Sequence, residues 1–183
     1  MNKSKLLIMD IVFAGMFSAV ISVLSVIAFP TPFGIPITLQ TFAIALCGYV
    51  LGWKLGLLST AVYILVGTIG LPVFAGFSAG IGVLFGMTGG FIWGFLFLAA
   101  LCGLQADSAN RFIKIALGLL GLIICHILGI IQFSLIASTS IIKSFFIVSS
   151  SFLIKDIISI FGAYFVSIAI KRAVTKLGYN RNV

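Results

Sequence analysis

The sequence predicts an all-α membrane protein with six transmembrane helices, and three observations support this fold class. Hydrophobic residues make up 62% of the 183 residues and charged residues 8%, whereas soluble domains are about 45–50% apolar and about 25% charged. Apolar runs recur along the chain at lengths suited to roughly 30 Å of hydrocarbon. Basic residues gather between alternate runs. These features disfavour a soluble enzyme, a nucleic-acid-binding protein and a disordered chain.

Six apolar segments account for the predicted spans within a single membrane domain, residues 1–183. The first follows Lys3 and Lys5 as a secretory signal would, but it exceeds the length of a signal core and is interpreted as a retained helix. The second, third and fourth are short, so we expect them to extend into their flanking loops or to cross a thinned bilayer. In chain order, the predicted spans are residues 6–29, 38–51, 55–69, 91–104, 112–137 and 145–170.

The basic residues predict the orientation of this domain. Of the 11 Lys and Arg residues, nine lie before span one, between spans two and three, between four and five, or after span six. With six spans these four regions share one side of the membrane, and the loops on the other side hold only Lys143. Because basic loops stay in the cytoplasm, both termini are expected to be cytoplasmic.

Two loops on the outer side have unusual compositions. Residues 29–36 contain three prolines and must be extended or turned. Residues 70–90 contain seven glycines and no charged residue. This second loop is either a flexible connection or a folded cap over a ligand cavity. The aromatic residues Phe74, Phe77 and Phe85 favour the cap, because flexible linkers are usually polar.

The adjacent charges Lys155 and Asp156 lie deep inside span six. Charged residues at such depth are rare and usually face a cavity or a partner. They are either a structural pair that holds helices together or part of a binding site. Neighbouring side chains on a helix point about 100° apart and cannot both face one partner, which argues against the structural pair. Asp156 and Ser159 lie on one face of the helix. We therefore expect Asp156 to line a binding site, as an acceptor for ligand N–H groups.

Other polar and small residues leave two interpretations open. Gln40, beside Thr38 at the start of span two, belongs either to a helix cap or to a binding site. In span five, His126 and Gln132 are each expected to form an interhelical hydrogen bond. In span one, a stripe of small residues either packs inside the chain or forms a docking surface for another membrane subunit. This stripe consists of Ala14, Ser18 and Ser22.

Catalytic chemistry is nearly absent from the sequence. The chain has three acidic residues and one histidine, without a nucleophile–base or metal-binding constellation. It also lacks the phosphate-binding GxxxxGK[ST] motif. We therefore expect a protein that is not an enzyme and that has no cofactor. Any uphill transport would take its energy from a partner or an ion gradient.

Three segments and one acid together resemble the BioY family, the biotin-binding S components of energy-coupling factor transporters. They are Pro32-Phe-Gly-Ile-Pro-Ile-Thr-Leu-Gln-Thr41, Gly67-Thr-Ile-Gly-Leu-Pro-Val-Phe-Ala-Gly76, Gly80-Ile-Gly-Val-Leu-Phe-Gly-Met-Thr-Gly-Gly-Phe91 and Asp156. The resemblance implies a bacterial plasma-membrane protein that binds biotin on its outer side, beneath the cap. It further implies that uptake depends on a transmembrane coupling protein and two ATP-binding-cassette ATPases, which dock through the small residues of span one.

The resemblance also implies the site residues. Asp156 would bind the ureido ring, and Lys155 would replace a lysine that the family usually carries at position 159, where this chain has Ser159. The implied ligand-binding residues are Gln40, Phe74, Gly76, Ser78, Thr88, Trp93, Lys155, Asp156 and Ser159.

The second half of the chain departs from the family pattern. Met87 stands where the family usually has proline, and Ile154 and Lys155 replace the usual Pro-Gly before the aspartate. Span five of the family often carries an aromatic residue near its glycine, whereas this chain has His126 and Gln132 around Gly129. One alternative is therefore an S component for another vitamin. A second is a structural or assembly membrane protein without a ligand, against which the charge-free loop and the buried Lys155–Asp156 pair argue.

Overall fold

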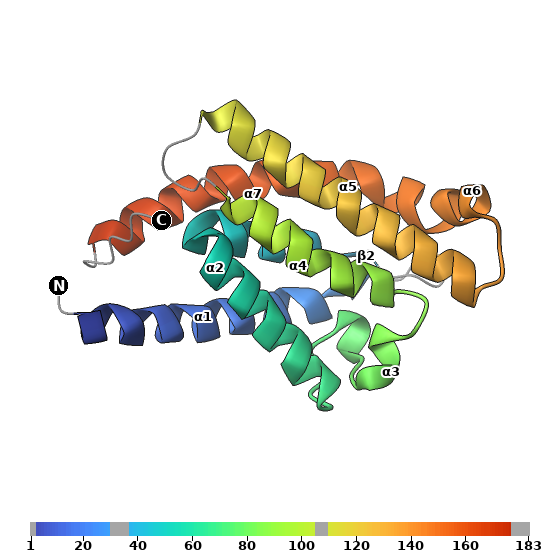
Figure 1. Ribbon diagram of the computed structural model, residues 1–183, viewed down its shortest axis with the longest axis horizontal. Coiled ribbons are helices and arrows are strands. Elements are labelled where there is room, and N and C mark those ends of the chain that lie inside the picture. The colour runs from blue at the N-terminus through green and yellow to red at the C-terminus, as the bar shows by residue number, and fades with distance from the viewer. Residues whose placement is uncertain (1–2, 30–36, 105–109, 177–183) are drawn as a thin grey trace.

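The computed structural model describes residues 3–29, 37–104 and 110–176, and these residues are mostly helical (Figure 1). The elements in chain order are α1 (Lys3–Val26), β1 (Ala28–Phe29), β2 (Ile37–Thr38), α2 (Gln40–Thr68), η1 (Ala75–Phe77), α3 (Ile81–Leu84), α4 (Gly89–Gly103), α5 (Arg111–Ile136), α6 (Ile141–Ser144), η2 (Phe145–Ser149) and α7 (Ser150–Lys176).

Four described helices are long and apolar enough to cross a membrane. They contain Leu7–Val26 in α1, Gln40–Thr68 in α2, Arg111–Ile136 in α5 and Phe152–Lys176 in α7. These correspond to predicted span one, to spans two and three together, to span five and to span six. Predicted span four is the shorter apolar helix α4, which begins two residues earlier than expected.

Helix α2 folds back on itself at Gly52. This residue has φ 80° and ψ 172°, a conformation outside the helical region that glycine adopts readily. The Gln40 side-chain amide donates a hydrogen bond of 2.7 Å to the Tyr63 hydroxyl, 23 residues further along. In a straight helix these residues would lie about 35 Å apart. The two halves of α2 therefore run antiparallel, and the predicted break between residues 51 and 55 falls at this turn.

Glycines allow the two halves of α2 to approach closely. A Cβ atom added at Gly56 would lie 2.9 Å from the Gly48 Cα atom, closer than real Cβ contacts. Small residues at helix interfaces permit such backbone contact in membrane proteins. The hairpin brings Gln40 and Thr41, at the start of α2, into the middle of the bundle beside α4 and α7.

The glycine-rich segment 70–90 is folded, with η1, α3 and the first residues of α4 inside it. Phe74 is 1% exposed and packs edge-to-face against the Tyr63 ring, with centroids 5.5 Å apart. The Gly80 amide also donates to the Gly67 carbonyl at 2.8 Å. The segment thus has the conformation expected of a cap, although Phe77 and Phe85 point outward and are each 68% exposed.

Strands β1 and β2 flank the proline-rich loop. They pair antiparallel, with Ala28 opposite Thr38 and Phe29 opposite Ile37. The expected extended or turned conformation of the loop itself concerns residues 30–36, which lie outside the described residues. The pairing fixes Thr38 next to the start of α2.

The small-residue stripe of α1 lies mostly inside the chain, as the packing interpretation expects. The side chains of Ala14 and Ser18 are buried, where α1 packs on α2. Ser22 is half-buried, and its hydroxyl donates to the Ser18 carbonyl at 2.9 Å. Small side chains here let α1 approach α2 closely. Ala14 and Ser18 therefore contribute to packing within the chain.

Candidate ligand-binding site

A cavity of about 220 Å³ lies beneath the cap, between α2, α4, α5 and α7. This volume lies below the roughly 300–1,000 Å³ of pockets for drug-sized molecules, so a small ligand fits best. The lining residues are Thr38, Gln40, Thr41, Phe74, Ala75, Ser78, Val83, Thr88, Phe91, Ile92, Phe95, Leu122, Cys125, His126, Phe152, Lys155 and Asp156. Cap residues form one side, and the charged residues of α7 form another.

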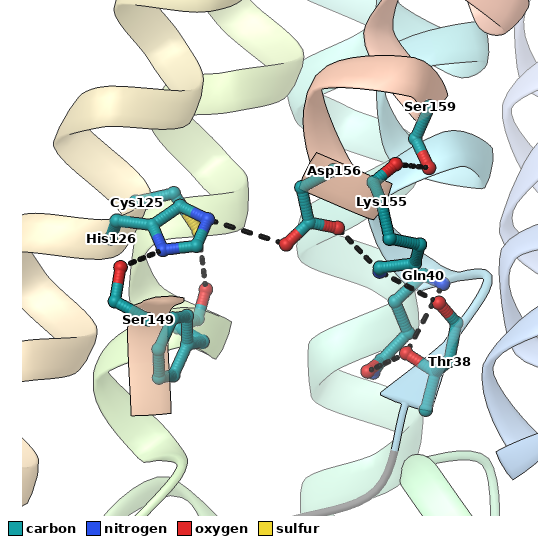
Figure 2. Close-up of polar contacts among 9 residues, drawn as sticks. Thr38, Gln40, Cys125, His126, Ser149, Lys155, Asp156 and Ser159 are labelled. Atoms are coloured by element: carbon teal, nitrogen blue, oxygen red, sulfur yellow. Dashed lines mark hydrogen bonds and ion pairs between the residues drawn. The ribbon is translucent and has the colours of Figure 1, made fainter. Parts of the chain in front are cut away.

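Asp156 is the centre of a polar network that crosses the cavity wall (Figure 2). Its side chain is 7% exposed. One carboxylate oxygen, Oδ2, lies 3.2 Å from His126 Nε2, and the other, Oδ1, contacts the Lys155 ammonium. The network therefore joins α5 and α7 through a buried carboxylate that both neighbours stabilise.

The Lys155 ammonium reaches back to its sequence neighbour. Besides Asp156 Oδ1, its Nζ donates to the Thr38 carbonyl oxygen at 2.9 Å. The 100° between neighbouring residues describes only the directions in which the Lys155 and Asp156 side chains leave the helix. The flexible four-carbon stem of lysine brings the ammonium onto the Asp156 side of the helix, where it connects α7 to β2.

His126 links the carboxylate to a second hydroxyl. Its Nδ1 lies 2.6 Å from the Ser149 hydroxyl oxygen. A neutral imidazole has one donor and one acceptor nitrogen. If Nε2–H donates to Asp156, Nδ1 accepts from Ser149, which fixes the tautomer by its partners. Ser149 ends the π-helical turn η2, and turns of this kind are frequent at functional sites.

A second set of polar groups lies at the start of α2. The Thr38 hydroxyl donates to Gln40 Oε1 at 3.0 Å, and Gln40 Nε2 donates to Tyr63 at 2.7 Å. The Thr38 hydroxyl also accepts from the Gln40 backbone amide at 3.3 Å. Gln40 therefore belongs to the cavity wall and also braces the two halves of α2, whereas the residue that caps α2 is Leu39, with no side-chain cap hydrogen bond.

The cap is attached to α5 by Gln132. Its side-chain amide donates to the carbonyl oxygens of Leu84 and Gly86, each at 2.8 Å. The expected interhelical hydrogen bonds of span five are thus present, from His126 to α7 and from Gln132 to the end of α3. Gln132 lies outside the cavity lining and holds the cap in place over it.

The structure brings six of the nine expected ligand-binding residues together around the cavity. They are Gln40, Phe74, Ser78, Thr88, Lys155 and Asp156. Trp93 lies outside the lining and is 39% exposed on the outer face of α4. Gly76 also lies outside it, in η1, with φ 62°. The Ser159 hydroxyl donates to the Lys155 carbonyl at 2.9 Å, within its own helix.

Several lining residues are not identifiable as site residues from the sequence. The sequence predicts an interhelical hydrogen bond for His126, which it makes, but not a place at the cavity. Thr41, Phe91, Phe95 and Phe152 are further lining residues that the sequence reasoning missed. Thr41 directly follows Gln40, so its position in the sequence could have indicated that it lines the site. The three phenylalanines lie in apolar helices, where nothing in the sequence distinguishes a lining residue from its neighbours.

The described residues contain no group of three His, Cys, Asp or Glu side chains that could hold a metal ion. The cavity offers instead one carboxylate, one ammonium, hydroxyl groups and aromatic walls. This combination can bind a small molecule that has N–H donors at one end and an apolar body.

Comparisons with known proteins agree with this geometry. The family model described as "BioY family" matches residues 1–176. The biotin transporter BioY of Thermotoga maritima is 45% identical over 118 residues, which cover 64% of this chain and 69% of that protein. The biotin transporter BioY of Rhodobacter capsulatus is 39% identical over 139 residues, covering 72% of this chain and 73% of that protein.

A solved structure is also similar in fold. The crystal structure of the S component for biotin from an energy-coupling factor type ABC transporter matches with a TM-score of 0.81 and 25% sequence identity. The match covers 96% of this chain and 95% of the other chain. The similarity therefore extends over the cap and all helices that surround the cavity.

Proposed function

The chain belongs to the BioY family, and we propose that it is a biotin-binding S component of an energy-coupling factor transporter. Biotin enters from the outer side and occupies the cavity beneath the cap. The observation that carries this proposal is the buried Asp156 carboxylate at the wall of that cavity.

The acceptor capacity of Asp156 suits a cyclic urea. A carboxylate offers about four acceptor positions on its two oxygens. His126 and Lys155 use one on each oxygen. Two positions remain, and the ureido ring of biotin presents two N–H donors. The ring therefore completes the hydrogen bonding of a carboxylate that the protein holds in place.

The remaining walls suit the apolar part of biotin. Phe91, Phe95 and Leu122 supply hydrophobic surface for the sulfur-containing ring and the aliphatic chain. Phe74 anchors the cap above them through its contact with Tyr63. The hydroxyl of Thr88 lines the cavity near the cap and can donate to the carboxylate end of the ligand. The Ser78 hydroxyl, which also lines the cavity, donates to the Ala75 carbonyl at 2.8 Å.

Lys155 has two alternative roles in this proposal. It either pairs with the carboxylate of biotin or holds Asp156 in the orientation that accepts the ureido ring. In the structure its ammonium contacts Asp156 and the Thr38 carbonyl. One extended ligand cannot place opposite ends on two side chains that touch each other. The geometry therefore favours the role in positioning Asp156.

The proposal includes six membrane crossings and cytoplasmic termini in a bacterial plasma membrane. The hairpin in α2 supplies two of the crossings, and α4 supplies one. The start of α1, the start of α5 and the end of α7 lie toward the left of Figure 1, and α3 and α6 lie toward the right. Most of the basic residues in the described helices, other than Lys143 in α6 and Lys155, thus lie at the end opposite the cap, which supports cytoplasmic termini by the positive-inside rule.

Release of biotin into the cell depends on partners in this proposal. The chain is a binding subunit rather than an enzyme, and a transmembrane coupling protein with two ATP-binding-cassette ATPases supplies the energy. The similarity to a crystal structure of an S component from an energy-coupling factor type ABC transporter supports this assignment.

Thermal unfolding with a panel of vitamins tests the ligand. A ligand that binds only the folded chain stabilises it by about 2.7 kcal/mol at 100 times its dissociation constant. We expect biotin to raise the unfolding temperature of the purified, vitamin-free protein. Stabilisation by another vitamin instead of biotin would assign a different substrate. No stabilisation by any of them would favour a structural or assembly protein.

A further inference from the structure

A second cavity, of about 240 Å³, lies at the end of the bundle opposite the cap. The same four helices line both cavities. Thr41 in α2, Leu122 in α5 and Asp156 in α7 line the first, and residues eight positions away on each helix line the second. These residues are Tyr49, Lys114 and Tyr164. Eight residues of helix span about 12 Å.

The two cavities are separated by packed apolar side chains. Leu98 in α4 and Ile160 in α7 are both 0% exposed and lie between the two sets of lining residues along their helices. The second cavity is therefore a separate feature and not an extension of the candidate biotin site.

The lining of the second cavity is strongly basic. Lys114, Lys171 and Arg172 contribute three positive charges, and the residues that line the cavity include no acid. An ammonium group has three N–H donors, and a guanidinium group has a planar set that fits phosphate oxygens in pairs. Tyr49 and Tyr164 form an uncharged wall beside these cations, and their rings pack edge-to-face with centroids 5.6 Å apart.

Local hydrogen bonds involve the residues of the uncharged wall. The Tyr49 hydroxyl donates to the Lys114 carbonyl at 3.2 Å, beside Gly118, where a Cβ atom would collide with that hydroxyl. The Ser167 hydroxyl donates to the Tyr164 carbonyl at 2.6 Å. These contacts fix the uncharged wall, and the three cations lie where α5 begins and α7 ends.

We propose that this cavity binds the phosphate group of an anionic phospholipid. Lys114 lies in the first turn of α5, which begins at Arg111, and Lys171 and Arg172 lie in the last two turns of α7, which ends at Lys176. Helix ends of this kind lie at the depth of lipid headgroups. Basic pockets between transmembrane helices bind anionic headgroups, and each nearby cation contributes about 1 kcal/mol.

The test measures the unfolding temperature of the full-length protein in detergent against added dioleoylphosphatidylglycerol. We expect a saturable increase. The same concentrations of dioleoylphosphatidylcholine, or of sodium phosphate, should leave the temperature unchanged. The double variant Lys171→Gln/Arg172→Gln should bind phosphatidylglycerol about 30-fold more weakly, which corresponds to two losses of about 1 kcal/mol each.

A matched double variant separates this cavity from the general basic surface. Lys54→Gln/Arg111→Gln removes two exposed cations that lie outside the cavity lining. Its affinity for phosphatidylglycerol should stay within about two-fold of the affinity of the wild-type protein. Lys171→Arg/Arg172→Lys, which keeps both charges, should retain most of the affinity and controls for folding.

Three results would overturn the proposal. Equal stabilisation by phosphatidylcholine would assign the effect to acyl chains, and equal stabilisation by sodium phosphate would assign it to a soluble anion. Equal weakening in the two double variants would show diffuse attraction without a defined cavity.

Discussion

Removing the side-chain amide of Gln132 should release biotin faster without abolishing its binding. Gln132 lies outside the cavity, and its amide makes two hydrogen bonds of 2.8 Å to carbonyl groups at the end of α3. A single hydrogen bond contributes about 0.5–1.5 kcal/mol, and the membrane average is near 0.6 kcal/mol. The variant Gln132→Leu therefore weakens the closed position of the cap by about 1–2 kcal/mol.

This loss predicts the kinetics. A cap that opens more readily by 1–2 kcal/mol raises the dissociation rate about 5- to 30-fold. The assay follows radiolabelled biotin after the loaded protein is diluted into excess unlabelled biotin. Ser22→Ala, which removes one hydroxyl–carbonyl hydrogen bond within α1, is the control and should leave the rate unchanged. An unchanged rate in Gln132→Leu would refute the idea that this contact holds the cap over the ligand.

Three further predictions concern the site and its packing. Lys155→Ala should weaken biotin and biotin methyl ester by similar factors, because the ammonium positions Asp156, as competition binding would show. His126→Leu should weaken biotin about 10-fold or more, since hydrogen bonds to charged groups contribute about 1.5–3 kcal/mol, and calorimetry measures the change. Gly94→Ala should destabilise the fold by about 1–3 kcal/mol, seen as a lower unfolding temperature, because its Cβ atom would lie 2.5 Å from the Cα atom of Cys125.

Each of these predictions has a matched comparison. Selective loss of biotin with unchanged binding of the methyl ester would show that Lys155 contacts the ligand carboxylate. His126→Gln, which keeps an amide donor, should retain more affinity than His126→Leu, and equal losses would contradict a donor role. Gly15→Ala, inside α1 at a position with no atom within 4 Å, should not lower stability, because alanine favours a helix more than glycine does. Equal destabilisation in the two variants would contradict the packing argument.

The sequence predicted a mostly helical membrane protein from its apolar runs, and it drew attention to Lys155 and Asp156, which line the cavity, because charged residues are rare inside membrane helices. Long apolar runs indicated helices, and prolines and glycines marked the two outer loops. The predicted break between residues 51 and 55 falls at the turn at Gly52. A charged pair deep in an apolar helix is costly, so Lys155 and Asp156 indicated a binding site without any structural information. The folded cap was favoured from the composition of residues 70–90, whereas the residues alone left the role of Gln40 open between a helix cap and a binding site.

The orientation of each helix about its own axis could not be predicted in the same way. Lipid tails are as apolar as a protein core, so an apolar helix has no polar stripe that distinguishes its two faces. The resemblance implied Trp93 as a ligand-binding residue, yet Trp93 faces outward, whereas Phe91 and Phe95 of the same helix line the cavity. The small residues of α1 had the same ambiguity, and Ala14 proved to be buried.

Long-range contacts of flexible side chains were a second limit. The spacing of Lys155 and Asp156 suggested separate directions, but the lysine stem bends toward its neighbour. His126 and Asp156 are distant in the sequence and meet because α5 packs against α7. No local pattern reports such a meeting.

Calorimetric titration of biotin into the vitamin-free protein and its Asp156→Asn variant tests the central claim most directly. The buried carboxylate should accept the ureido N–H groups, and hydrogen bonds to a charged group contribute about 1.5–3 kcal/mol each. We predict tight binding by the wild-type protein and at least about 10-fold weaker binding by Asp156→Asn. The control Asp10→Asn, which makes the same substitution in α1 outside the cavity, should bind biotin as tightly as the wild-type protein. Equal affinity in all three proteins, or no binding by the folded unchanged protein, would contradict the account.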